Sequence, residues 1–401
     1  MKKKVFIAAF VTMSFTVMGC NFSTNKTTNV SAMVEEADSC FYGIGRSEDQ
    51  QKAIKLYEEA AELGYAQAQF RLGGCYSVGG GVNRDLSKAF YWYKKAAEQG
   101  DADAQNNVGI CYLHGRGVKK DYNKAFYWYY KSAEQDNPIA QYSLGNCYNM
   151  GWGTEIDAHK AVYWYGRAAE HEWAYAQYNL GISYEKGIGV QQNAKLAMHW
   201  FYKAANNGLA NAQYHLGCNF LYGKITEQNY NKAVYWFLKA AEQGYISAYV
   251  NLGACYLEGW GVEKNLQKSL DWYTKAAEGG DPQSQLYLGT CYLDGTGGAK
   301  KNANKAIDWF RRAADHGDNI AQFNIGFFYS QGIGVPKDFE QTVYWWQKAA
   351  NDGFAVAQSG LGDCYRDGKG VAKDLNKAKY WYEKAAEQGN IYAKEELLKL
   401  K

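Results

Sequence analysis

The side chains that could bind a metal or act as nucleophiles are scattered along this 401-residue chain. No two histidines stand at the spacing of a metal-binding pair, and no Cys-x-x-Cys pair occurs. A zinc site needs three or four such ligands close together. We therefore expect no metal and no cofactor. The histidines are His114, His159, His171, His199, His215 and His316.

Two short motifs approach catalytic or phosphate-binding patterns, and both fail on spacing or position. Five residues separate Gly362 from Gly368-Lys369, where a phosphate-binding loop has four. Ser23-Thr-Asn-Lys26 matches the Ser-x-x-Lys of penicillin-recognising enzymes, but it lies in a polar N-terminal stretch. We therefore expect that the protein is not an enzyme.

The N-terminal residues have the pattern of a bacterial export signal. Lysines occupy positions 2–4, and the apolar stretch 5–18 is too short to span a membrane. The sequence Val-Met-Gly-Cys at 17–20 resembles the lipobox, in which a diacylglycerol is attached to the cysteine. We interpret 1–19 as a lipoprotein signal peptide and Cys20 as the lipidation site. The alternative is an uncleaved signal anchor with a chance cysteine.

The segment after Cys20 bears on localisation. Residues 20–36 are rich in Asn, Ser and Thr, and we expect a flexible tether there. Asn21 is not the Asp that favours inner-membrane retention in many Gram-negative bacteria. The expected location is the cell envelope, with the lipid anchoring the chain to the periplasmic or surface face of the outer membrane.

The charge of the mature chain is close to zero. The chain has 44 Lys and Arg against 41 Asp and Glu, and three of the lysines belong to the signal. Nucleic acids and anionic membrane surfaces attract proteins with a basic excess. We therefore expect no nucleic-acid partner. An aromatic content of 16% also excludes a disordered chain.

Residues 66–390 form a tandem repeat, which determines the fold. A Leu-Gly pair or a close variant recurs every 36 residues, once every 37, and a Trp follows each glycine at constant phase. The glycines are Gly73, Gly109, Gly145, Gly181, Gly217, Gly253, Gly289, Gly326 and Gly362. The tryptophans are Trp92, Trp128, Trp164, Trp200, Trp236, Trp272, Trp309, Trp345 and Trp381.

Each unit has the periodicity of two amphipathic helices. In the first full unit we expect helices over 66–78 and 85–99. The glycine lets the two helices approach, and we expect the Trp ladder to fill the space behind it. One unit cannot bury this face alone, so the units must stack. Residues 37–65 are predicted to be a degenerate N-terminal repeat, and 391–401 a C-terminal capping helix.

The pattern Ala-Gln-x-x-Leu-Gly, Gly-x-Gly-Val and Lys-Ala-x-x-Trp-Tyr-x-Lys-Ala-Ala resembles the Sel-one-like repeat (SLR). This family of tetratricopeptide-like repeats includes bacterial lipoproteins. The resemblance implies an all-α, right-handed α-solenoid of about nine 36-residue helix-turn-helix repeats with degenerate capping units. Its first helices would line a concave face. The sequence departs from the pattern at 223–226, where a Gly-x-Gly loop is lost, and at Asp136 and Glu172, where a capping glycine is missing.

Most cysteines occupy one repeat position. Equivalent positions in stacked units lie about 10 Å apart, whereas a disulfide needs Cα atoms within about 7 Å. We therefore interpret these cysteines as small buried residues. Cys40 and Cys218 lie off this position and are the two expected to react. The cysteines of the row are Cys75, Cys111, Cys147, Cys255, Cys291 and Cys364.

The resemblance also indicates which side chains face a partner. In tetratricopeptide-like geometry, the concave positions lie six and three residues before each glycine and one, four and five after it. Aromatic anchors are typical of protein interfaces. The alternative is that these aromatics pack against the neighbouring repeat. The candidates are Phe70, Tyr142, Tyr175, Tyr178, Tyr214, Tyr222, Phe323 and Phe327.

Three functions are compatible with these features. The first is a membrane-anchored interaction scaffold that binds a protein or peptide in its concave face. The second is an immunity protein that neutralises a secreted toxin such as a phospholipase, as the resemblance to lipid-anchored family members implies. The third, implied by the cysteine-rich relatives, is a hydrolase of β-lactams or cell-wall peptides, and no residue of this chain supports it.

Overall fold

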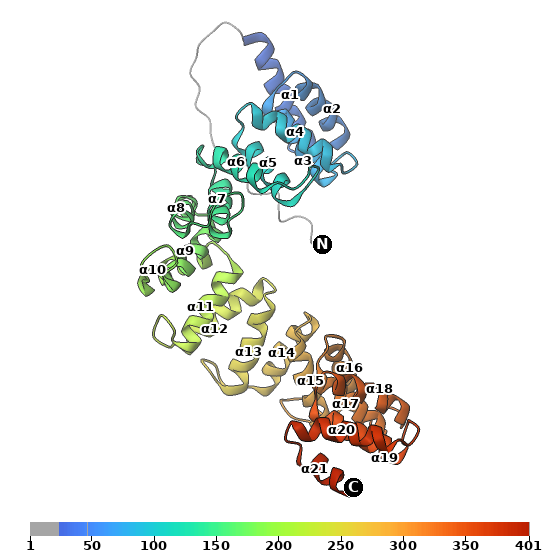
Figure 1. Ribbon diagram of the computed structural model, residues 1–401. Coiled ribbons are helices and arrows are strands. Elements are labelled where there is room, and N and C mark those ends of the chain that lie inside the picture. The colour runs from blue at the N-terminus through green and yellow to red at the C-terminus, as the bar shows by residue number, and fades with distance from the viewer. Residues whose placement is uncertain (1–23, 46, 401) are drawn as a thin grey trace. The chain divides into compact units, whose positions relative to one another are not determined.

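The structure, a computed structural model, describes residues 24–45 and 47–400, which form helices and no strand (Figure 1). The predicted all-α fold is confirmed. The signal peptide at 1–19 and Cys20 lie outside the described residues. The chain divides into two compact units, residues 1–171 and 172–401, and within each unit consecutive helices pack side by side as an α-solenoid.

The helices follow the repeat. In each repeat a first helix pairs with a second helix, and the second helix packs on the first helix of the next repeat of the same unit. The helices of the first unit are α1 (Thr24–Tyr42), α2 (Gln50–Glu62), α3 (Ala66–Val78), α4 (Leu86–Glu98), α5 (Ala102–His114), α6 (Tyr122–Ala133), α7 (Pro138–Met150) and α8 (Ala158–Glu170). Those of the second unit are α9 (Ala174–Lys186), α10 (Ala194–Asn206), α11 (Ala210–Tyr222), α12 (Tyr230–Glu242), α13 (Ile246–Glu258), α14 (Leu266–Glu278), α15 (Pro282–Asp294), α16 (Ala303–Asp315), α17 (Asn319–Gln331), α18 (Phe339–Asn351), α19 (Ala355–Asp367), α20 (Leu375–Glu387) and α21 (Ile391–Lys399).

Side-chain caps fix where the helices begin. An Asp or Asn precedes each second helix and accepts a hydrogen bond from a backbone N–H in the first turn, as Asp85 does from Lys88 at 3.0 Å. Several first helices are capped in the same way, by Asp101, Asn137, Asp281 and Asp318. The first helices from α3 to α19 end at a glycine in the left-handed conformation, such as Gly115 with φ 69°.

The two helices of a repeat touch at the Leu-Gly position. A Cβ on Gly145 of α7 would lie 2.6 Å from the ring of Tyr165 on α8, and a Cβ on Gly109 would meet Tyr129 at the same distance. The aromatic against the glycine is therefore the residue after the Trp, and the expectation that the Trp fills this space is wrong. Most of the tryptophans lie half-buried, some of them under a cation, as Trp272 does with Lys275 Nζ 4.1 Å from the ring centroid.

A buried glutamine joins successive repeats. Gln105 donates to the carbonyl of Ala97 at 3.2 Å and accepts from Gln135 at 2.8 Å. The same relay recurs when Gln213 accepts from Gln243 and when Gln358 accepts from Gln388. Because an amide that is buried without partners costs free energy, each relay specifies how two repeats stack.

The relay is interrupted where the second amide is replaced. His171, His316 and Asp352 occupy the donor position. The carbonyl oxygens of the matching glutamines are buried and accept no hydrogen bond within the described part of the chain. Those glutamines are Gln141, Gln285 and Gln322.

The prediction of a flexible tether at 20–36 is wrong from Thr24 onward, because that part of the chain belongs to α1. Val34, Ala37 and Cys40 are buried on one side of α1, at the spacing of a helix that packs on α2. The hydroxyl of Tyr57 on α2 donates to Asp38 on α1. The polar composition of the segment hides this narrow apolar face, so the first repeat begins before residue 37.

The loops that lack a glycine behave in two ways. Asp136 and Glu172 keep the left-handed conformation, with φ 61° and 59°, and Arg167 pairs with the carboxylate of Asp136. In the loop at 223–226, Ile225 takes the place of the second glycine and does not adopt a positive φ. A hollow of about 400 Å³ lies beside it, lined also by Ala194, Phe220 and other residues.

Candidate partner-binding face

The candidate aromatics three residues before the glycine pack within their own repeat. Phe70 lies 5.8 Å from Tyr93 between ring centroids, and Tyr178 lies 5.7 Å from Phe201. Tyr142, Tyr214 and Phe323 make the same contact with Tyr165, Phe237 and Trp346. All five are half-buried. Their first role is therefore to cover the aromatic that packs on the glycine, and only their outer edges reach solvent.

Three candidates are exposed on first helices of the second unit. Tyr175 on α9 is 49% exposed, Tyr222 on α11 is 59% exposed and Phe327 on α17 is 36% exposed. Lys224 lies over the ring of Tyr222 at 5.5 Å, which leaves most of that ring open. These side chains offer apolar area to a partner without disturbing the core.

Around α9, α11 and α13 the first helices carry a cluster of polar and aromatic side chains. His215 lies 3.1 Å from Glu185 through its Nε2 and packs on Phe201, with ring centroids 4.3 Å apart. Burial lowers the pKa of His215, against the attraction of Glu185. The cluster thus contains a partly buried carboxylate beside a partly buried imidazole. Burial disfavours the charged imidazole, whereas the carboxylate favours it.

The same cluster continues toward α13. Asn251 donates to the hydroxyl of Tyr214 at 3.3 Å, and the ring of Tyr214 lies 5.0 Å from that of Tyr245. Burial raises the pKa of Tyr214 and of Cys218, so both are neutral at physiological pH. The surface combines phenol, amide and apolar groups with little charge, as protein interfaces do.

The cysteines of the row are buried, as expected, and so is Cys40. Cys75, Cys111 and the rest of the row are free and buried, and burial raises the pKa of Cys111 to about 11. Cys40 is also buried, in the position that a tyrosine fills in later repeats, which argues against the reactivity expected for it. Cys218 is half-buried, and its raised pKa disfavours the reactive thiolate.

The loop and junction tryptophans are covered by neighbouring rings. Trp152 stacks on Tyr122 at 6.2 Å and Trp260 on Tyr230 at 6.0 Å, so both tie a loop to the preceding repeat. Trp173 lies 6.2 Å from Tyr175. Their edges remain available, but their main contacts are internal.

The sequence reasoning missed a second row of exposed aromatics. Most of the residues immediately before the Trp are tyrosines, about half exposed, that meet the neighbouring Trp edge-on, as Tyr91 does with Trp92 at 4.9 Å. Their signal was visible as a tyrosine at constant phase. The row comprises Tyr91, Tyr127, Tyr163, Tyr235, Tyr344 and Tyr380.

Within the described residues, no group of three or more His, Cys, Asp or Glu side chains is arranged to hold a metal ion. In the same part of the chain, no helix has both the length and the apolar content that a membrane span requires. Ser23 and the side chain of Lys26 lie outside the described side chains.

The fold and the face together define a tandem helical-repeat protein. The Sel1 repeat family profile matches residues 31–65, 66–101, 102–137, 138–172, 174–209, 210–245, 246–281, 282–318, 319–354 and 355–390. The chain belongs to the Sel1 repeat family. Proteins built from these repeats generally mediate protein–protein interactions and are typically not catalysts. The first matched repeat begins at 31, which corrects the boundary expected at 37.

Solved structures share the architecture. A protective antigen of uropathogenic Escherichia coli strains with an SLR fold is 33% identical, with 92% of this chain and 87% of that chain covered and a TM-score of 0.62. A Sel1 repeat protein from Oxalobacter formigenes is 33% identical, with 78% and 90% covered and a TM-score of 0.60. An immunity protein from Pseudomonas aeruginosa is 23% identical over 53% of this chain and 81% of its own, with a TM-score of 0.38, a likeness of fold alone. No curated protein sequence matches this chain.

Proposed function

We propose that the protein is an interaction scaffold that binds a protein or peptide on its first-helix face. The exposure of Tyr175, Tyr222 and Phe327 carries this proposal. The exposed area of these side chains is not buried in folding, whereas a partner that covers it gains apolar contact area. The neutral phenol and amide groups beside them supply hydrogen bonds to a polypeptide.

Substitution of the exposed tyrosines tests this proposal. A Tyr175→Ala, Tyr222→Ala double variant is expected to bind a partner, captured by cross-linking in the native envelope, at least about tenfold more weakly. A Tyr235→Ala, Tyr344→Ala double variant is the matched control, because those tyrosines are similarly exposed on second helices. Equal loss in both variants, or no loss in the first, refutes the assignment to the first-helix face.

The identity of the captured partner separates the narrower alternatives. A secreted toxin such as a phospholipase would make the scaffold an immunity protein, and protection of a sensitive cell would follow its expression. The side chains named on this face can bind a partner through apolar contacts and hydrogen bonds, and none of them is a nucleophile beside an activating base. Hydrolysis of a β-lactam or a cell-wall peptide by the pure protein would therefore contradict the scaffold proposal.

We further propose that Cys20 carries a lipid that anchors the scaffold in the outer membrane. The lipobox-like sequence at 17–20 supports this location, and the E. coli relative is a protective antigen, which fits a protein displayed outside the cytoplasm. A Cys20→Ser variant is expected to lose radiolabelled palmitate and to leave the membrane fraction. Undiminished labelling of that variant would rule out Cys20 as the lipidation site.

A further inference from the structure

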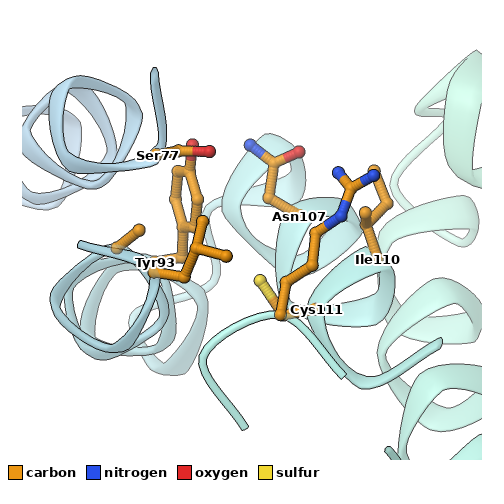
Figure 2. A pocket seen from close by; sticks show the side chains of 8 residues that line it. Ser77, Tyr93, Asn107, Ile110 and Cys111 are labelled. Carbon is orange, nitrogen blue, oxygen red and sulfur yellow. The ribbon is translucent and has the colours of Figure 1, made fainter. Parts of the chain in front are cut away.

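A small polar pocket opens on the first unit between α3, α4 and α5 (Figure 2). Its volume is about 80 Å³, well above the roughly 10–15 Å³ that one water needs, so it admits a group of several heavy atoms. Ile110 is one of the lining residues, and it stands one residue after Gly109, at one of the positions expected to face a partner. The pocket therefore belongs to the same kind of surface as the proposed partner-binding face.

Two hydroxyls form one side of the pocket. Figure 2 shows Ser77 and Tyr93 together, opposite Asn107. Burial raises the pKa of Tyr93, so the phenol is neutral. Each of the two hydroxyls carries one O–H that can donate to a ligand.

The other side holds an amide and a cation with no partners. Asn107 on α5 and Arg116 in the following loop line the pocket. Neither side chain donates a hydrogen bond to another group within the described residues, and no carboxylate there pairs with Arg116. Burial, together with Arg116 and Lys120, lowers the pKa of His114 at the end of α5.

The remaining lining residues supply no competing negative charge. They are Leu86, Ala89, Ile110 and Cys111. Because burial raises the pKa of Cys111 to about 11, its sulfur is a neutral thiol at physiological pH. An anion that enters the pocket thus meets one guanidinium, one amide and the hydroxyls of Ser77 and Tyr93 as donors, with apolar side chains around them.

We propose that this pocket binds a carboxylate of the partner polypeptide, from an Asp or Glu side chain or from a C-terminus. One guanidinium balances the single charge of a carboxylate, and its planar fork matches the two carboxylate oxygens. A phosphate group carries nearly two charges at neutral pH and would leave one unbalanced here. This inference rests on the proposed scaffold function, since it names the chemistry of one contact in that complex.

The test uses the full chain, purified in detergent, and small probes observed by ligand-detected NMR. The probes are N-acetylglutamate methylamide, N-acetylalanine, the neutral glutamine counterpart of the first, and inorganic phosphate. Both carboxylate probes are expected to bind, and an Arg116→Gln variant to bind them about tenfold more weakly. A Lys119→Gln variant removes the same charge from the same loop outside the pocket and is expected to change binding less than about twofold.

The outcomes test the carboxylate site independently of the scaffold function. Equal binding of the glutamine probe, preference for phosphate, or equal loss in the Lys119 variant overturns the carboxylate site. A captured partner that binds the Arg116 variant as tightly as the wild type overturns it too, while the scaffold function stands. The stronger of the two carboxylate probes indicates whether the partner offers a side chain or a C-terminus.

Discussion

A Gly117→Ala variant is expected to be destabilised by about 3 kcal/mol or more, although the substitution adds only one methyl group. Gly117 has φ 71°, where an alanine costs about 1–2 kcal/mol. Its added Cβ would also overlap the backbone carbonyl of Leu86 at the start of α4. Because backbone cannot rotate away as a side chain does, the loop around Gly117 must change its conformation or the contact with α4 must open.

Gly115→Ala in the same loop is the matched control. Gly115 has φ 69°, but the nearest atom to its added Cβ is the Cβ of Lys120 at 3.5 Å, an ordinary contact. This variant is expected to be destabilised only by the conformational cost of an alanine at positive φ, about 1–2 kcal/mol. Urea midpoints measured by circular dichroism compare the two. Equal midpoints would show that the approach to Leu86 contributes nothing to stability.

The chain contains a natural version of this substitution. Ile225 occupies the position equivalent to Gly117, and Ala194 the position equivalent to Leu86. There the loop does not take the positive φ, and a hollow of about 400 Å³ is lined by both residues. A side chain at this position is thus accommodated by a different loop conformation, which indicates how the Gly117 variant must adjust.

Gly145→Ala and Gly166→Ala are expected to change stability in opposite directions. The Cβ added to Gly145 would lie 2.6 Å from the Tyr165 ring and 3.2 Å from the carbonyl oxygen of Ala161. Overpacking of this kind costs about 1–3 kcal/mol, more than the gain of about 1 kcal/mol from replacing a helical glycine. The Gly145 variant should therefore unfold at lower urea.

Gly166 lies next to Tyr165 on α8, with nothing within 4 Å of an added Cβ. Its alanine variant keeps the helix-propensity gain alone and should be more stable by about 0.5–1 kcal/mol. Both variants belong to one repeat, so a shift of the urea midpoint compares them directly. Destabilisation by Gly166→Ala, or stabilisation by Gly145→Ala, would contradict the assignment of Gly145 to the close helix contact.

The repeat period was sufficient to predict the fold, because nine in-phase glycines and tryptophans leave little freedom in helix pairing. The caps at Asp101 and Asn137 lie at the same phase of their repeats. The role of the Trp was not predictable, since the Trp and the residue after it lie about 100° apart on the helix and either could face the glycine. Packing of Tyr165 on Gly145 resolves this.

The candidate face was only partly predictable for a related reason. Tyr178 and Tyr214 stand at a position shared between the face and the aromatic pair of each repeat, so sequence alone gives no measure of their exposure. Tyr175 and Tyr222 lie clear of that pair and are exposed. The pocket at Asn107 and Arg116 draws on three helices and a loop, a combination that periodicity within one repeat does not reveal.

The interrupted glutamine relay gives the solenoid unequal mechanical compliance. Repeats act like springs in series, so under an end-to-end pull the most compliant repeat deforms first. The repeats that contain Gln141, Gln285 and Gln322 lack the hydrogen bond that joins the two helices of a repeat at Gln105 or Gln213. Under such a pull these repeats would deform first, and in each of them the weak point is set by a single side chain.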